Sequence, residues 1–134
     1  EYEEARQGGL DAAYNNLARL YILEGEYSSA VSLLLQGLPL TADDAVRYDM
    51  LKNLGWSRLG QGRFEEARPF LERAIELAAD RAPAHCLLAQ VSESLGVMEQ
   101  ANEEWENCLR YASSTNPDED IWIGLAIQHF DRGN

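Results

Sequence analysis

A short pattern of residue types recurs three times along this chain of 134 residues, at nearly constant spacing. Each copy has a leucine inside an apolar run, a glycine eight residues later and an alanine five residues after the glycine. A large side chain follows four residues further on, and a small one three residues beyond it. A fixed period of this length is typical of stacked structural repeats. The three copies are Leu17, Gly25, Ala30, Leu34 and Gly37; Leu54, Gly62, Ala67, Leu71 and Ala74; and Leu88, Gly96, Ala101, Trp105 and Cys108.

This spacing is the one expected for a pair of antiparallel helices. The glycine ends the first helix, where the backbone needs a left-handed conformation that glycine adopts without strain. The alanine lets the second helix approach the first, and the large side chain fills the space to the next pair. The step is 34 residues from Leu54 to Leu88 and 37 from Leu17 to Leu54, which predicts a three-residue insertion near residues 43–47.

The same signals predict seven helices in a single all-α domain, residues 1–134, cut from a longer protein. Pro69 falls inside the fourth helix, and a proline beyond the first turn costs about 3 kcal/mol, so the start of that helix is expected to be bent or irregular. Gly8 and Gly9 separate residues 1–8 from the first repeat, which predicts a short helix or a frayed tail there. The expected helices are 9–24, 27–38, 44–60, 64–78, 82–95, 98–112 and 118–131.

A fourth copy of the pattern begins near the end of the sequence and stops after its first helix. Asn116 stands at the cap position, Pro117 at the first helical position and Glu119 near the third, which resembles a capping box. Repeat arrays need a terminal helix with a polar outer face, and this half-repeat is expected to serve as that cap. Its pattern residues are Trp122, Leu125, Ala126, His129 and Gly133.

The pattern resembles the tetratricopeptide repeat, whose period is 34 residues. The stretch from Leu54 to Ala74 carries the likeness best, although Arg58 stands where the family has an aromatic side chain. The resemblance implies a right-handed superhelical α-solenoid of antiparallel hairpins that acts as a protein-interaction scaffold or adaptor, and not as an enzyme. It covers three full repeats and a partial fourth, at about 11–44, 48–81, 82–115 and 119–134.

The charge of the chain narrows the range of partners. Asp and Glu total 23 against 11 Lys and Arg, which gives a net charge of −12. Nucleic acids and anionic membranes attract clustered positive charge, so neither is expected as a partner, whereas a protein or peptide is. No apolar run reaches the roughly 20 residues that span a bilayer. The sequence contains no phosphate-binding loop, zinc motif or calcium loop, and no cofactor is expected.

The two cysteines, Cys86 and Cys108, show no metal-ligand or redox spacing. We interpret them as reduced structural thiols, because a free cysteine behaves as a small apolar residue. Reduced thiols favour a cytoplasmic location. A nucleophilic pair of Cys86 with His129 is conceivable across two first helices, but no third group or oxyanion donor accompanies it, so catalysis is not expected.

A stacked array of hairpins is curved, and the first helix of each pair lines its concave face, where peptides or partner helices bind. Asn16 and Asn53 each stand one residue before the pattern leucine, and the family resemblance implies that such amides contact the backbone of a bound peptide. Arg19 and Lys52 add positive charge to the same strip, where they could meet a carboxylate. The predicted peptide-binding residues are Asn16, Arg19, Lys52, Asn53, Trp56 and Gln90.

Two alternatives concern other parts of the array. One subtype of the family grips the acidic C-terminal tails of chaperones, but Cys86 and Gln90 stand where its third repeat needs positive charge. The last helix is apolar nearly all round, which suits burial on two sides, so it could form a homodimer or a docking interface. The residues predicted for that interface are Trp122, Ile123, Ile127 and Phe130.

Overall fold

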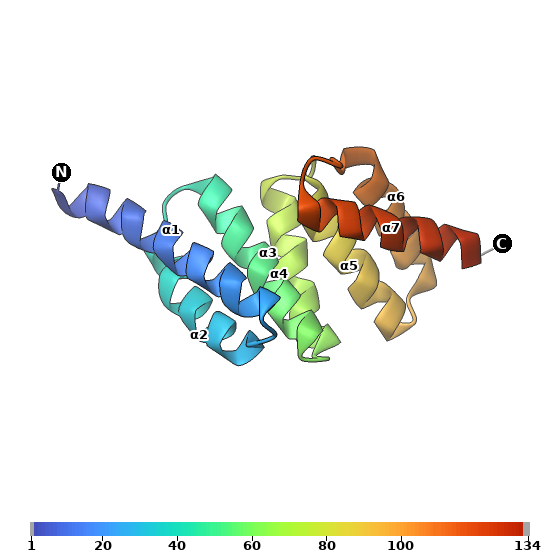
Figure 1. The fold of residues 1–134 in the computed structure, drawn as a ribbon, viewed down its shortest axis with the longest axis horizontal. Helices are drawn as coiled ribbons and strands as arrows, with labels where there is room; N and C mark the ends of the chain where they lie inside the picture. The colour runs from blue at the N-terminus through green and yellow to red at the C-terminus, as the bar shows by residue number, and fades with distance from the viewer. Residues whose placement is uncertain (1, 133–134) are drawn as a thin grey trace.

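The computed structural model describes residues 2–132, with side chains from residue 9 onward. Its helices are α1 (Tyr2–Leu23), α2 (Tyr27–Gly37), a short 3-10 helix η1 (Leu38–Leu40), α3 (Asp44–Gly60), α4 (Phe64–Leu77), α5 (Ala82–Leu95), α6 (Met98–Tyr111) and α7 (Pro117–Arg132). Figure 1 shows three hairpins side by side, α1 with α2, α3 with α4 and α5 with α6, and α7 crossing the last of them. The predicted all-α repeat solenoid is confirmed.

The glycines of the pattern end the first helix of each hairpin, as predicted. Gly25, Gly62 and Gly96 have φ angles of +80°, +75° and +77°, in the left-handed region that side chains disfavour. The second helix of each hairpin begins two residues after its glycine. The recurrence of glycine in the sequence therefore marks three identical backbone turns.

The small and large positions of the pattern form the core. Leu71 on α4, for example, lies directly against Gly55 on α3, the other helix of its own hairpin. Close-packed interiors of this kind leave little room for a change of volume. All six residues are at most 1% exposed: Ala30, Ala67, Ala101, Leu34, Leu71 and Trp105.

The first helix is longer than the sequence predicts. α1 begins at Tyr2 and continues without a break through Gly8 and Gly9. A glycine inside a helix costs about 1 kcal/mol relative to alanine, but the Glu, Ala, Arg and Gln residues at positions 3–7 are strong helix formers. The expected break before residue 9 is therefore wrong.

The spacing from the first repeat to the second is three residues longer than the next one, and the structure places the extra residues at the start of α3, close to the predicted insertion. α3 begins ten residues before Leu54, whereas α5 begins only six residues before Leu88. α4 contains Pro69 at its sixth position and is assigned as one continuous helix from its first residue to its last. The proline therefore does not divide the helix.

Cys86 of α5 and Cys108 of α6 form a disulfide, so the interpretation of both as reduced thiols is wrong. Both residues are fully buried, and their Cα atoms lie 4.7 Å apart because the hairpin brings the two helices into close contact there. The bond removes the argument for a cytoplasmic location, which rested on free thiols. It also leaves Cys86 without the thiol that a nucleophilic pair with His129 would need. No helix in the described part of the chain is long and apolar enough to cross a membrane.

Candidate functional site on the concave face

A hollow of about 530 Å³ opens where the first helices α1 and α3 face the beginning of α7. Most of its walls are polar or charged, which distinguishes it from the apolar contacts between helices. Side chains of both signs are present. The lining residues are Asn15, Asn16 and Arg19 of α1; Asp49, Lys52 and Asn53 of α3; Arg81 and Pro83 around the start of α5; and Thr115, Asn116, Pro117, Asp118 and Glu119 before and within the first turn of α7.

Lys52 is the most deeply placed cation of this hollow, with only 8% of its surface exposed. Its amine forms no hydrogen bond or ion pair with any described side chain, and Nζ lies 5.7 Å from the centre of the Trp56 ring. Burial lowers the pKa of the Lys52 amine, and the nearby carboxylates of Asp49 and Asp118 oppose that effect. A buried cation without a paired anion favours the binding of one.

Asn53 lies beside Lys52 on α3 and is 1% exposed. Its Nδ2 donates a hydrogen bond to Oδ1 of Asn15 on α1, at 2.9 Å. Its own Oδ1 is buried and has no partner among the described residues. An unsatisfied buried acceptor costs about 1–3 kcal/mol, so a turn of this side chain that brought Oδ1 to a donor would be favourable.

Arg19 and Asp118 connect the two ends of the array across the hollow. The guanidinium of Arg19 donates to Oδ2 of Asp118 from Nη2 at 2.8 Å and from Nε at 3.3 Å. The Asp118 side chain is 15% exposed, and that of Arg19 is 41% exposed. An acidic residue in the first turn of α7 is therefore already paired with one of the cations of the hollow.

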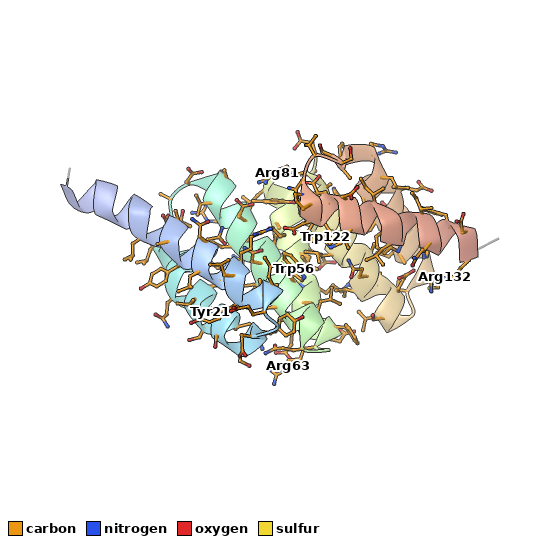
Figure 2. The ribbon with its side chains drawn as sticks, in the orientation of Figure 1. Tyr21, Trp56, Arg63, Arg81, Trp122 and Arg132 are labelled. Carbon is orange, nitrogen blue, oxygen red and sulfur yellow. A yellow bond between two sulfur atoms is a disulfide. The ribbon has the colours of Figure 1, made fainter. Side chains whose placement is uncertain are left out.

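Two tryptophans make a second contact between α7 and the first two repeats. The rings of Trp56 on α3 and Trp122 on α7 meet edge to face, with centroids 5.4 Å apart and planes at 70°. Figure 2 labels both near the middle of the molecule, between α3 and α7. Edge-to-face pairs add to the burial energy of the two rings. The pair fixes the start of α7 against α3.

Arg81 forms the wall of the hollow next to α5. Its guanidinium lies over the Tyr48 ring at 4.2 Å and pairs with Asp49 at 3.3 Å. The Tyr48 hydroxyl accepts a hydrogen bond from the Ala84 amide at 3.0 Å. Burial raises the pKa of Tyr48 to about 12. Arg81 is thus already paired with residues of α3, unlike Lys52.

The structure brings four of the six predicted peptide-binding residues to this hollow. Asn16 is exposed at its edge, and Arg19, Lys52 and Asn53 line it. Trp56 is half-buried against Trp122. The remaining residue, Gln90, does not line the hollow; its amide donates to the Cys86 carbonyl at 3.4 Å.

Sequence reasoning missed the other half of the hollow. Asn15 had a signal, because it holds the same register as Lys52, two residues before the pattern leucine. Arg81 and the residues before α7 lie outside the repeat pattern. Tyr48 and Asp49 hold Arg81 in place, and the tilt of α7 brings the residues before it to the hollow; no local spacing reports either arrangement.

The residues predicted for a homodimer interface do not form one exposed patch. Trp122 is 5% exposed because it packs on Trp56. Ile123 and Phe130 are half-buried, whereas Ile127 is 50% exposed. Trp122 is therefore covered by this chain itself and does not face a partner.

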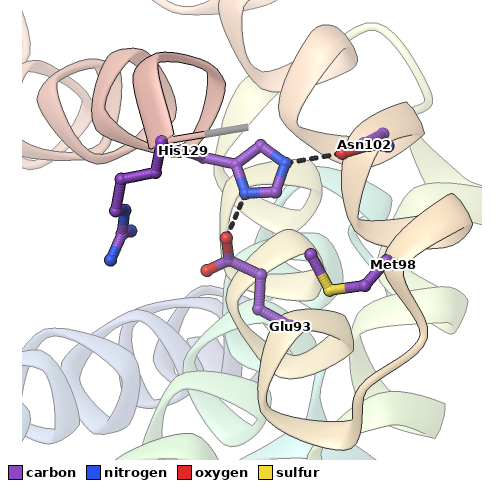
Figure 3. Close-up of a pocket in the computed structure, with 5 residues that line it drawn as sticks. Glu93, Met98, Asn102 and His129 are labelled. Atoms are coloured by element: carbon purple, nitrogen blue, oxygen red, sulfur yellow. Dashed lines mark hydrogen bonds and ion pairs between the residues drawn. The ribbon is translucent and has the colours of Figure 1, made fainter. Parts of the chain in front are cut away.

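A second hollow, of about 430 Å³, lies at the other end of α7 beside Glu93, Met98, Asn102, His129 and Arg132 (Figure 3). His129 Nδ1 contacts the Glu93 carboxylate on α5, and Nε2 lies 2.6 Å from Oδ1 of Asn102 on α6. These contacts tie the end of α7 to both helices of the third hairpin. Among the described residues, no three His, Cys, Asp or Glu side chains gather as a metal site requires.

Comparison with known proteins agrees with this architecture. The chain is similar to the C-terminal tetratricopeptide-containing domain of a Plasmodium falciparum protein described as FK506-binding, with a TM-score of 0.70 at 10% identity over 97% of this chain and 94% of that one. It is also similar to the second tetratricopeptide domain of human RPAP3, solved with an HSP70 peptide, with a TM-score of 0.67 at 18% identity over 92% of this chain and 97% of that one. At these identities, the likeness shows the fold alone.

No curated protein sequence matches the chain. Two family models described as tetratricopeptide repeat do match it, over residues 13–46 and 48–81. Together they cover just over half of the 134 residues, and they include the hairpins that supply most of the hollow. The chain belongs to the tetratricopeptide repeat family.

Proposed function

We propose that this protein binds an extended acidic peptide in the hollow between α1, α3 and α7. As a tetratricopeptide array the chain is a protein–protein interaction module, and such arrays are typically non-enzymatic scaffolds. The observation that carries the proposal is Lys52, whose side chain is largely buried and lines the hollow, and whose amine has no hydrogen-bonding or ionic partner among the described side chains. A ligand carboxylate is the group that this amine lacks.

The amides around Lys52 supply the other contacts that an extended peptide needs. Asn53 Oδ1, which is buried without a partner, would accept a backbone N–H once the side chain turns toward the hollow, and the exposed Asn16 amide can both donate and accept at the edge. Arg19 adds a planar guanidinium that can hold a second carboxylate. A volume of about 530 Å³ falls within the range of small-ligand sites, so a few residues of the peptide would enter it.

The RPAP3 domain gives independent support for the chemistry of the ligand. The peptide in that complex reads SGPTIEEVD, which carries three acidic side chains in nine residues. A similar fold therefore holds an acidic peptide in that protein. The third repeat of this chain lacks matching cations, because Cys86 is in a disulfide and Gln90 is neutral. The peptide would thus be held mainly by the first two repeats.

Selection from a random peptide-display library tests this function. The wild type is compared with Lys52→Met, which removes the buried charge and keeps a chain of similar length. The matched control is Arg73→Met, which removes one positive charge from an exposed position on α4. We expect Asp- and Glu-rich sequences to be enriched by the wild type and the control, and lost by Lys52→Met. No enrichment, or enrichment indifferent to Lys52→Met, would exclude the proposal.

Self-assembly through α7 is the second candidate, and exposed apolar side chains are the observation behind it. Ile121 is 65% exposed and Ile127 is 50% exposed. Trp122, the largest apolar side chain of α7, is buried against Trp56, so it is not available to a homodimer interface. Analytical ultracentrifugation over a wide concentration range checks this candidate: a constant monomer mass would rule it out.

A further inference from the structure

One wall of the hollow is made by an acidic segment of the chain itself. Residues 115–119, here named the α7 start, all line it. They come from the far end of the sequence and face residues of the first two repeats. The segment reads Thr-Asn-Pro-Asp-Glu, and the carboxylate of Asp118 pairs with Arg19, a cation that the proposed peptide would use.

The charges of the hollow balance only while this segment is in place. Arg81 pairs with Asp49, and Arg19 pairs with Asp118. Asp118 is also one of the two carboxylates whose field acts on Lys52. If the α7 start moved away, Arg19 would lose its ion pair and Lys52 would lose a nearby anion. A site that carries an unmatched pair of cations when open binds anions more tightly than the closed site does.

We propose that the α7 start is an internal ligand of the concave face, and that a bound peptide displaces Asp118 from Arg19. The inference rests on the proposed function and adds its regulation: the closed form lowers the affinity for an acidic partner. A carboxylate of that partner would take the place of Asp118 at Arg19, and Lys52 would hold another. Only a partner that brings its own carboxylates can therefore compete with the internal segment.

The contacts of α7 permit such a movement without unfolding the helix. Its first turn is capped from within: Asn116 Oδ1 accepts from the Asp118 amide at 2.9 Å, and Glu119 Oε1 accepts from the Ser113 amide at 2.9 Å. These bonds do not involve α1 or α3. The far end of α7 is held by His129 through Glu93 and Asn102. Movement of the α7 start out of the hollow would therefore break two contacts with the first repeats, the ion pair of Asp118 and the packing of Trp122 on Trp56, while the cap and the docking of the far end remain.

Displacement costs the ligand part of its binding energy. When only a fraction of molecules is open, the apparent dissociation constant rises in inverse proportion to that fraction. Asp118→Asn removes the charge of the internal ligand and keeps its shape and the capping bonds of Asn116. Asp120→Asn is the matched control, because Asp120 is exposed, belongs to the same first turn and does not line the hollow.

The binding test uses the full chain and a labelled synthetic peptide that copies residues 115–121, with both ends blocked. We expect this peptide to bind Asp118→Asn about three- to fivefold more tightly than the wild type, since a partly exposed ion pair is lost. The Asp120→Asn protein should behave as the wild type, and Lys52→Met should abolish binding. Equal affinity for wild type and Asp118→Asn, or no binding to either, would overturn the inference.

A second measurement reads the position of the α7 start without any ligand. In protein labelled with 5-fluorotryptophan, the three tryptophans give three fluorine resonances, which single Trp→Phe variants assign. We expect Asp118→Asn to shift or broaden the resonances of Trp56 and Trp122 and to leave that of Trp105 in place. Identical spectra for Asp118→Asn and Asp120→Asn would contradict the internal ligand, even if display selection had found acidic peptides. The converse result, a shift without selected peptides, would retain the internal contact and remove the proposed function.

Discussion

The guanidinium of Arg19 on α1 lies 2.8 Å from the carboxylate of Asp118 on α7, although ninety-nine residues separate them in the sequence. Most contacts in a repeat array join neighbouring hairpins, so stability is a sum of local terms. This ion pair instead joins the first helix to the last. α7 therefore packs on the third hairpin and also forms a wall of the hollow beside the first two repeats.

A double-mutant cycle measures how strongly this contact couples the two ends. Arg19→Ala, Asp118→Ala and the double variant should give a coupling free energy of about 0.5–1 kcal/mol in urea unfolding, since one partner is largely buried and the other is not. The pair of Arg63 and Glu66, whose side chains are both more than half exposed, serves as control and should give a smaller coupling. Equal values for the two cycles would mean that the long-range pair adds nothing to the docking of α7.

The packing of Trp122 on Trp56 predicts that substitutions at two neighbouring positions of α7 change the free energy of unfolding by very different amounts. Trp122→Ala should lower the free energy of unfolding by about 3 kcal/mol, because it removes a buried ring and leaves a cavity. Ile121→Ala, at a position that is 65% exposed, should change it by less than about 0.5 kcal/mol. Chemical denaturation of both variants checks the difference. A loss at Ile121 as large as at Trp122 would mean that the opposite face of α7 is buried.

The disulfide between Cys86 and Cys108 should contribute measurably to stability. It closes a separation of 22 residues, for which loop-closure entropy predicts about 3 kcal/mol. Replacing both cysteines with alanine should lower the free energy of unfolding by about that amount and abolish the effect of a reducing agent. The unfolded, unreduced wild type should show no free thiol in a thiol titration; two free thiols would contradict the bond.

His85 gives the protein a pH-dependent contact inside the third hairpin. Its Nδ1 lies 2.6 Å from a Glu104 oxygen, and Nε2 lies 2.8 Å from the Ala79 carbonyl. Burial lowers the pKa of the imidazole, but these two hydrogen bonds outweigh it and raise the pKa above its usual 6.5. Because the folded value is the higher one, the stabilisation is complete below the unfolded pKa and is lost as pH rises through the folded pKa.

Urea unfolding between about pH 6 and 9 checks this dependence. The wild type should lose more stability over that range than His85→Gln, which cannot become charged. Parallel curves for the two proteins would show that His85 carries no extra proton in the folded state. Comparison with the variant isolates the contribution of His85 from that of the other groups of the chain.

The sequence predicts the hairpins well because their turns impose strict backbone requirements. Gly25, Gly62 and Gly96 recur since a positive φ excludes most other residues. Burial follows the pattern less closely at the end of the array. Leu54 and Leu88 are at most 1% exposed, whereas Leu17 in the same register is 43% exposed, because α1 has no described helix before it to cover that face.

The candidate site was only half predictable, for a different reason. The positions of Asn53 and Lys52 follow from the repeat register, and their place on a first helix could be predicted from it. The hydrogen bond of Asn53 to Asn15 depends on how α1 packs on α3, and the contact of Arg19 with Asp118 depends on how α7 crosses the array. That crossing is set by Trp122 and by the anchoring of His129, which no periodic pattern encodes.

Two glycines with opposite surroundings give a final test of the packing. A Cβ on Gly55, in the middle of α3, would lie 2.4 Å from Cδ2 and Cγ of Leu71 on α4. Gly55→Ala should therefore force the two helices apart and lower the free energy of unfolding by about 1–3 kcal/mol. A Cβ on Gly124, in the middle of α7, meets no atom within 4 Å.

Gly124→Ala should accordingly raise the free energy of unfolding by up to about 1 kcal/mol, since alanine is the better helix former and nothing opposes it. Thermal and urea unfolding of the two variants, measured side by side, check the opposite signs. A stabilising Gly55→Ala would mean that α3 and α4 are further apart than the structure has them. A destabilising Gly124→Ala would mean that another surface covers this face of α7 in solution, which is the outcome that self-association through α7 requires.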